Sequence, residues 1–126
     1  MRTLRALTIH QPYAALIVNG VKDVENRTWF ASSLTEWGEP ILVHAAQRNG
    51  VPDPEVDGSD LKGYLVGAVW VDEIVRDSRS PWAVRGMYHW LLRDAVRFAE
   101  PIPCPGQRNL WTPTPAQLRR VPRFWA

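Results

Sequence analysis

The sequence predicts an α+β fold, in which a small β-barrel or a strongly bent sheet has short helices laid against it. Short segments with strand character recur along the chain between turn signals. Eleven prolines and eight glycines divide the chain into many short elements, and one apolar stretch near the start has the pattern of a well-formed helix. Because 126 residues suffice for one ordinary hydrophobic core, we expect a single domain over residues 1–126.

The first elements are a strand and a helix. The strand is expected over residues 4–9 and ends before Gln11 and Pro12. A short helix should follow over residues 13–20, since proline suits the first helical position, where its missing N–H costs nothing. Gly20 can end this helix in a left-handed conformation. The helix is apolar almost all round, so we expect it to pack into the body of the domain.

The remaining strands are expected over residues 22–29, 40–46, 63–75, 87–92 and 95–99. Gly67 marks a bend or bulge in the longest of them. The last two are expected to be joined by a tight turn at Arg93 and Asp94. Residues 47–62 are polar and rich in proline, which predicts a loop or weak helix outside the sheet.

The end of the chain is expected to be mostly irregular. The proline-rich residues 100–111 predict a closing segment without regular structure. Thr114, Pro115 and Gln117 then form a capping-box pattern with proline at the first helical position, which predicts a short surface helix. Trp70 and Trp90 lie within predicted strands, and both are expected to pack in the core.

Composition narrows the class of protein. With 45% apolar and 22% charged residues, the chain is typical of a folded globular protein. Cys104 is the only cysteine, so no internal disulfide can form, and a reducing compartment is expected. His10, Gln11 and Pro12 interrupt the apolar run near the start, which argues against a signal peptide. We therefore expect a cytoplasmic protein with no membrane segment.

Basic residues are unevenly distributed. Residues 1–63 hold six basic and eight acidic side chains, whereas residues 64–126 hold nine and five. No acid follows Glu100, although four arginines do. Such a basic end can meet phosphates. The alternative is a solvated face in a chain that simply favours arginine over lysine.

The densest set of chemistry-bearing residues lies in GVKDVENRTW, residues 20–29. On a strand, Glu25 and Arg27 point to the same face. Lys22 directly follows the helix-ending glycine, so its amine can swing to either side. A mobile cation, a carboxylate and a planar guanidinium suit a ligand with both donor and acceptor edges, such as a nucleobase with its phosphate. The alternative is an exposed strand with ordinary surface ion pairs.

The stretch LTIHQPYAALIVNGVKDVENRTW resembles the opening of the ASCH (activating signal cointegrator homology) domain, a member of the PUA-like superfamily. Its G-x-K-x-x-E-x-R signature corresponds to Gly20, Lys22, Glu25 and Arg27. The likeness continues in ILVHAA, LVGAVWV, SPWAVRGMYHWLL and EPIPCPGQRNLW, and it thus covers nearly the whole chain in order.

This resemblance implies a small PUA-like β-barrel with a helix between its first two strands, and a cleft lined by Lys22, Glu25 and Arg27. Gln11 is implied as a neighbour in that cleft. Members of the family are thought to bind RNA or modified nucleotides, and some lineages hydrolyse the acyl amide of N4-acetylcytidine. Those enzymes have a threonine where this chain has Glu25, and they use a downstream acid for which Asp77 is the available counterpart.

Catalysis places demands on the same residues. For Lys22 to act as nucleophile or base near neutral pH, its pKa must fall from about 10.4 to roughly 7–8. Burial would lower that pKa, whereas Glu25 would oppose the change by stabilising the charged amine. Alternatively, Glu25 is the general base and Lys22 steadies an oxyanion. Lys22 and Glu25 are thus the catalytic candidates if the protein is an enzyme.

Two further ligand-binding candidates lie elsewhere. His44 faces either the core, as a satisfied buried histidine, or the cleft. Trp82, in the loop after the long strand, is our candidate base-stacking platform, and its alternative is packing onto the core. The three histidines are scattered and lack a cysteine partner, so we expect no metal site and no cofactor.

Three classes of function stay open. The first is a binding module for RNA or a nucleotide, the second a small hydrolase acting on a modified nucleoside or on RNA. The third is a protein-interaction module, for which protein partners would be required.

Overall fold

The computed structural model describes residues 4–31 and 38–123. Within them, six strands form one sheet in the order β2-β5-β4-β3-β1-β6. β1 pairs in parallel with β3, and the other pairs are antiparallel. The bounds are β1 Arg5–Ile9, α1 Tyr13–Val18, β2 Val24–Arg27, β3 Glu39–Ala45, β4 Tyr64–Val75, β5 Tyr88–Pro103, β6 Leu110–Trp111 and α2 Pro115–Arg119.

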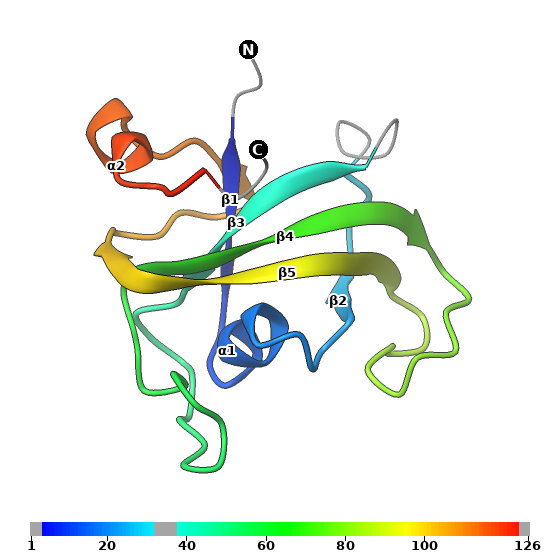
Figure 1. The fold of residues 1–126 in the computed structure, drawn as a ribbon. Coiled ribbons are helices and arrows are strands. Elements are labelled where there is room, and N and C mark those ends of the chain that lie inside the picture. Colours follow the sequence, from blue (N-terminus) through cyan, green and yellow to red (C-terminus); the bar gives the residue numbers. More distant parts are fainter. Residues whose placement is uncertain (1–3, 32–37, 124–126) are drawn as a thin grey trace.

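The sheet is bent into a half-barrel, with α1 against one side and α2 near the β1–β6 edge (Figure 1). This mostly-strand fold with two short helices confirms the predicted α+β class. One apolar core fills the space between α1 and the sheet, and a second lies where α2 packs near β1 and β6.

Helix α1 follows most of its sequence signals, but it ends at Val18 rather than near Gly20, and Pro12 is its N-cap rather than its first helical residue. Gly20 has the left-handed φ of +79° that is expected after the helix. Ala14, Ile17 and Val18 are buried, which confirms that the helix packs into the body. Gly67 makes this approach possible, because a Cβ there would lie 2.6 Å from Cγ1 of Val18. The strand pairing also shifts register beside Gly67, as the predicted bulge requires.

The predicted turn at Arg93 and Asp94 is wrong. β5 runs unbroken through both residues and pairs with β4 on either side of them. Asp94 does adopt a left-handed φ of +52°. Because β4 continues opposite it, this conformation produces an irregularity in the β4–β5 pairing and does not reverse the chain.

Two other expectations need correction, and two are confirmed. The closing segment is more regular than predicted, since β5 extends to Pro103 and β6 pairs with β1. Trp90 is fully buried, but Trp70 is half-buried, with the Arg93 guanidinium 5.2 Å from its ring centroid.

Thr114 and Gln117 form the predicted capping box of α2, and residues 47–62 contain neither helix nor strand.

Candidate functional site

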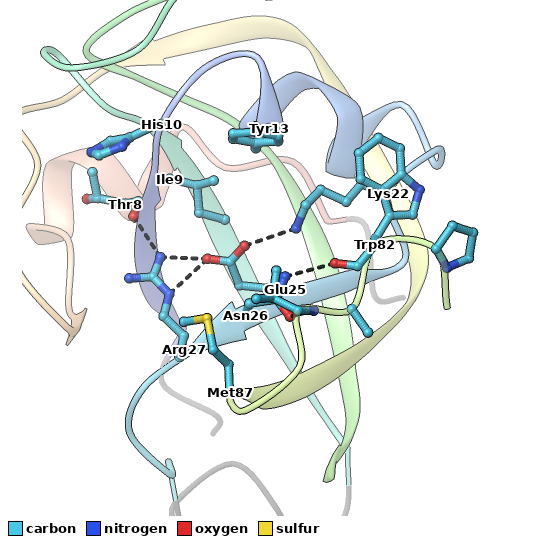
Figure 2. A pocket seen from close by; sticks show the side chains of 13 residues that line it. Thr8, Ile9, His10, Tyr13, Lys22, Glu25, Asn26, Arg27, Trp82 and Met87 are labelled. Carbon is cyan, nitrogen blue, oxygen red and sulfur yellow. Dashed lines mark hydrogen bonds and ion pairs between the residues drawn. The ribbon is translucent and has the colours of Figure 1, made fainter. Parts of the chain in front are cut away.

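A cavity of about 540 Å³ opens beside the start of α1. Its lining comes from the end of β1, the first residue of α1, residues 22–27 and the loop at 81–87. Figure 2 shows the side chains from these segments turned toward one shared hollow. The cavity is thus formed by parts of the chain that are up to 79 positions apart, Thr8 and Met87 being the outermost.

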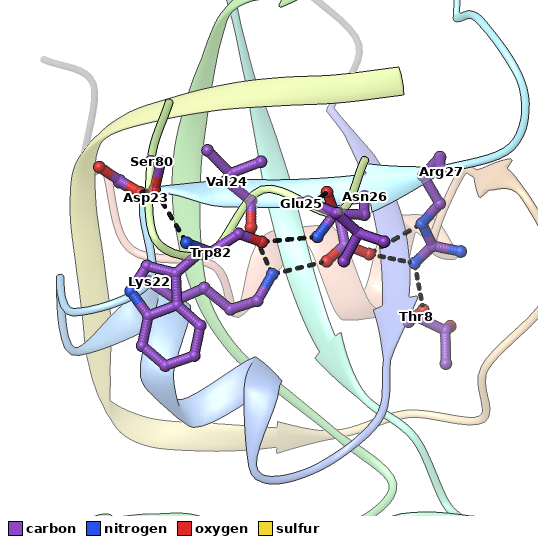
Figure 3. Close-up of polar contacts among 10 residues, drawn as sticks. Thr8, Lys22, Asp23, Val24, Glu25, Asn26, Arg27, Ser80 and Trp82 are labelled. Carbon is purple, nitrogen blue, oxygen red and sulfur yellow. Dashed lines mark hydrogen bonds and ion pairs between the residues drawn. The ribbon is translucent and has the colours of Figure 1, made fainter. Parts of the chain in front are cut away.

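Glu25 stands at the centre of an ionic cluster in this cavity. Its Oε1 lies 3.3 Å from Lys22 Nζ, and its Oε2 accepts from Arg27 Nε at 2.8 Å. Arg27 Nη2 lies 2.8 Å from the same Oε2 and also donates to the backbone carbonyl of Thr8 at 3.0 Å. Lys22 Nζ donates in addition to the Val24 carbonyl (Figure 3). The structure therefore brings together the three charged residues that the sequence singled out.

The chain reaches this arrangement through the end of α1. The backbone N–H groups of Val21 and Lys22 both donate to the carbonyl of Leu16, at 2.9 and 3.0 Å, which wraps the chain after Gly20. Lys22 therefore precedes the regular pairing of β2, which starts at Val24. The Lys22 side chain extends along β2 to Glu25. Arg27 lies two positions after Glu25 on the same strand, so both side chains point to the same face of the sheet.

The cluster combines burial with excess positive charge. Lys22 is 6% and Glu25 8% exposed, whereas Arg27 is partly open to solvent. Burial lowers the pKa of Lys22, with a smaller lowering from the Arg27 charge, against the raising effect of Glu25. With all three ionised, two cations face one carboxylate, so the cluster carries a charge of +1. Such a site favours an anion or an electron-rich edge.

Aromatic residues flank the cluster. The Tyr13 ring centroid lies 5.7 Å from Lys22 Nζ, and Trp82 lies beyond Lys22 at one end of the cavity (Figure 2). Asn26 is one of the side chains that hold the loop carrying Trp82. His89, whose Nε2 lies 2.7 Å from the Val84 carbonyl, is another. Asn26 donates through Nδ2 to the Trp82 carbonyl at 2.9 Å and accepts from the Val84 N–H at 2.8 Å.

Sequence reasoning missed Asn26 and Tyr13. Asn26 lies inside the signature stretch, between Glu25 and Arg27, but its strand parity is opposite to theirs. Tyr13 is the first residue of α1 and is 47% exposed. The sequence signal for its role is a large aromatic residue at the very start of the helix, which the apolar pattern assigns to the core-facing side.

Gln11 does not line the cavity. Its side chain is buried and turned toward the 47–62 loop, where Nε2 donates to the carbonyls of Gly58 and Leu61 at 3.1 and 2.9 Å. Its Oε1 accepts from the Ala15 N–H at 3.0 Å. Gln11 therefore ties the loop to the start of α1.

His44 also lies outside the cavity, in a buried chain of hydrogen bonds. Trp111 Nε1 donates to Thr8 Oγ1 at 3.2 Å, and His44 Nδ1 lies 3.2 Å from the same oxygen. His44 Nε2 must donate to the Cys104 carbonyl, 2.5 Å away, because a carbonyl only accepts. Nδ1 is then the acceptor from the Thr8 hydroxyl, which describes a neutral ring. Burial lowers the pKa of His44 in agreement with this.

Carboxylates and metal-ligand groups are scarce around this cavity within the described ranges. Among the residues that line the cavity there, Glu25 is the one carboxylate, and Asp77 does not line it. Residues 4–31 and 38–123 contain no group of three or more histidine, cysteine, aspartate or glutamate side chains placed to hold a metal ion. In the same ranges, no helix has the length and apolar character needed to cross a membrane.

A curved sheet with a helix after its first strand is consistent with the small PUA-like barrel that the sequence predicted. The ASCH domain family model matches residues 7–97, and the chain belongs to that family. Two similar solved structures are ASCH proteins of Zymomonas mobilis. One, a point mutant, is 19% identical with a TM-score of 0.62 and covers 94% of this chain and 96% of that chain.

The second, described as ASCH from the same organism, is 18% identical with a TM-score of 0.59, and covers 94% of this chain and 93% of that chain. At such identities the likeness shows a shared fold alone. No curated protein matches the sequence significantly.

Proposed function

We propose that this ASCH domain binds a nucleotide, free or within a single strand of RNA, in the cavity beside α1. The observation that carries the proposal is the convergence of Lys22, Glu25 and Arg27 inside a cavity that has aromatic residues on its wall. The ASCH membership supports RNA binding in general, and the geometry supports this cavity as the place where it occurs.

Each part of the site suits one part of a nucleotide. The cluster charge of +1 attracts a phosphate, and the Arg27 guanidinium is partly exposed, with Nη1 making no hydrogen bond among the described residues. Glu25 offers acceptors to a base amino group if its ion pairs rearrange. Trp82 and Tyr13 offer π-faces to a base, and stacking of this kind contributes about 1–3 kcal/mol per base.

The two lysines of this chain, Lys22 and Lys62, provide a matched test. Binding of a fluorescent ribonucleoside 5′-monophosphate, which reports on the first cavity alone, should weaken at least about tenfold in Lys22→Met, because the variant cannot donate a charge-assisted hydrogen bond to the ligand. Lys62→Met, which removes a lysine that donates to the Gly50 carbonyl at 3.0 Å outside the cavity, should bind like the unaltered protein. Equal binding by both variants, with folding checked by circular dichroism, would remove the proposal.

The burial of Lys22 favours a second candidate function, hydrolysis of a modified nucleoside. Its lowered pKa brings the amine closer to the range that a nucleophile or base needs. Glu25, within reach of the same space, is the alternative base. The unaltered protein should then release acetate from N4-acetylcytidine or degrade an RNA panel, and Glu25→Gln should abolish turnover. Tight binding without turnover would leave the binding module alone.

A further inference from the structure

A second hollow lies next to the first, on the other side of the end of β1. Its volume is about 290 Å³, and Thr8 and His10 line both hollows. In Figure 2, these two residues stand at the end of the first cavity opposite Trp82. The two hollows are therefore neighbours, and Thr8 and His10 form their common wall.

The second hollow is positively charged. Arg48 and Arg108 line it together with amide side chains such as Asn49 and Gln107, and none of its lining residues is acidic. Both arginines are exposed, and neither forms an ion pair with a carboxylate in the described ranges. Arg93 and Arg97, in contrast, are each paired with an aspartate. The charges of Arg48 and Arg108 are thus not neutralised by a carboxylate of the described residues.

The segment that carries Arg48 is anchored against the β1–α1 junction. The Val51 N–H donates to the Gln11 carbonyl at 3.0 Å, and Lys62 Nζ donates to the Gly50 carbonyl. Gly50 itself lies so close that a Cβ would meet Gln11 N at 2.7 Å. Arg48 is therefore presented from a loop that is fixed to the rest of the site.

The segment that carries Arg108 is anchored on the opposite flank. Gly106 rests on the buried hydrogen-bond chain, because a Cβ there would lie 2.7 Å from His44 Cε1 and 2.9 Å from Thr8 Oγ1. β6, which follows this segment, pairs with β1. The two arginines thus come from segments 60 positions apart that meet over the same two residues, Thr8 and His10.

We propose that the second hollow is a subsite for the phosphodiester and the adjoining nucleotide of a strand whose neighbouring nucleotide occupies the first cavity. The ligand is therefore a single-stranded oligonucleotide rather than a free nucleoside. This inference rests on the proposed function of the first cavity. The shared wall gives the strand its path, and the two unneutralised guanidinium groups hold its backbone.

The test compares ligand lengths. The four ribonucleoside 5′-monophosphates and RNA homopolymers of about two, three and five residues are titrated by calorimetry, with DNA homopolymers as a second arm that identifies the sugar. We expect affinity to rise from mononucleotide to trinucleotide. Arg48→Gln combined with Arg108→Gln should weaken trinucleotide binding about tenfold and leave mononucleotide binding unchanged.

The salt dependence gives an independent readout. The slope of log affinity against log salt concentration should shrink by about 0.7 for each phosphate that the protein no longer neutralises. Arg120→Gln, at the exposed end of α2 and outside both hollows, is the matched control and should keep both affinity and slope. The charge reversals Arg48→Glu and Arg108→Glu should weaken trinucleotide binding further.

The outcomes separate the two proposals. Equal affinity for mononucleotide and trinucleotide, unchanged in the double variant, overturns the second subsite and leaves the first cavity intact. Binding that is indifferent to Lys22→Met, or no binding of any probe, overturns the proposed function and the subsite with it.

Discussion

Two buried polar clusters meet at Thr8, and they are built in opposite ways. On one side, Arg27 of the ionic cluster donates to the Thr8 backbone carbonyl. On the other side, the Thr8 hydroxyl joins the neutral chain that runs from Trp111 to His44 and the Cys104 carbonyl. One residue of β1 therefore separates a charged network from an uncharged one.

The two clusters differ in the number of donors and charges that have no partner within the cluster. In the neutral chain every donor is matched to one acceptor, so the chain is complete and nothing is offered to a ligand. The ionic cluster has two cations for one carboxylate, and Arg27 Nη1 makes no hydrogen bond within the part of the chain that the structure describes. A completed network stabilises the fold, whereas an incomplete one at a cavity suits binding.

Removal of the central carboxylate should have the largest effect. Glu25→Ala leaves the buried Lys22 without its counter-charge, and we expect a loss of about 3 kcal/mol in the free energy of unfolding. Lys22→Met combined with Glu25→Gln removes the buried charge as well and should recover more than half of that loss without restoring RNA binding. Urea unfolding measures both variants. A single-variant loss below about 1 kcal/mol would show that the cluster is effectively solvated.

Disruption of the neutral chain should cost stability without changing binding at the first cavity, although His44 does line the second hollow. His44→Ala leaves the Thr8 hydroxyl and the Cys104 carbonyl without their partner, and we expect a loss of about 2 kcal/mol in unfolding free energy. Mononucleotide affinity at the first cavity should stay the same, because His44 does not line it. If mononucleotide affinity also falls in His44→Ala, the neutral chain takes part in binding and the proposed difference between the two clusters is wrong.

Loss of the aromatic wall should act on binding alone. Trp82→Ala is expected to reduce nucleotide binding by about 1–3 kcal/mol through the absence of stacking, with little change in unfolding free energy because the side chain is only half-buried. Trp70→Ala, which truncates a half-buried tryptophan outside the cavity, is the size-matched control. If both variants bind equally well, Trp82 does not touch the ligand.

The mildest effect is a pH dependence that belongs to the neutral chain. Because the pKa of His44 is lowered in the folded state from its ordinary value of 6.5, the unfolded chain takes up the proton first. Stability is thus fully present above pH 6.5 and falls as the pH drops toward the folded pKa. Between about pH 7.5 and pH 6 the change should stay below about 1 kcal/mol.

Two histidine variants isolate this contribution. His44→Gln should flatten the decline in unfolding free energy, whereas substitution of the exposed His10 by glutamine should leave it in place. A decline of the same size in the His44 variant would assign it to other groups.

The ionic cluster could be anticipated because its members are near neighbours in the chain. Lys22, Glu25 and Arg27 span six positions, so strand parity and the end of α1 fix most of their geometry. The sequence likewise predicted α1, the glycine that follows it and the capping box of α2, because each depends on residues that are close in the chain.

What the sequence did not reveal depends on distant partners. His44 meets Thr8 and Trp111, which are 36 and 67 positions away, so its role stayed open between cavity and core. Asn26 holds a loop 56 positions further on. The turn at Asp94 was predicted from local residue preference, but pairing with β4 across its whole length overrides that preference.

The central claim is that the incomplete ionic cluster, and not the neutral chain, receives the nucleotide. Nuclear magnetic resonance of the ¹⁵N-labelled protein can test it directly, because Trp82 and Trp111 report separately on the two clusters through their indole N–H signals. On titration with ribonucleoside 5′-monophosphates, the Trp82 signal should shift and saturate while that of Trp111 stays in place, and Lys22→Met should abolish the shift. A saturating shift at Trp111 with none at Trp82 would contradict the claim.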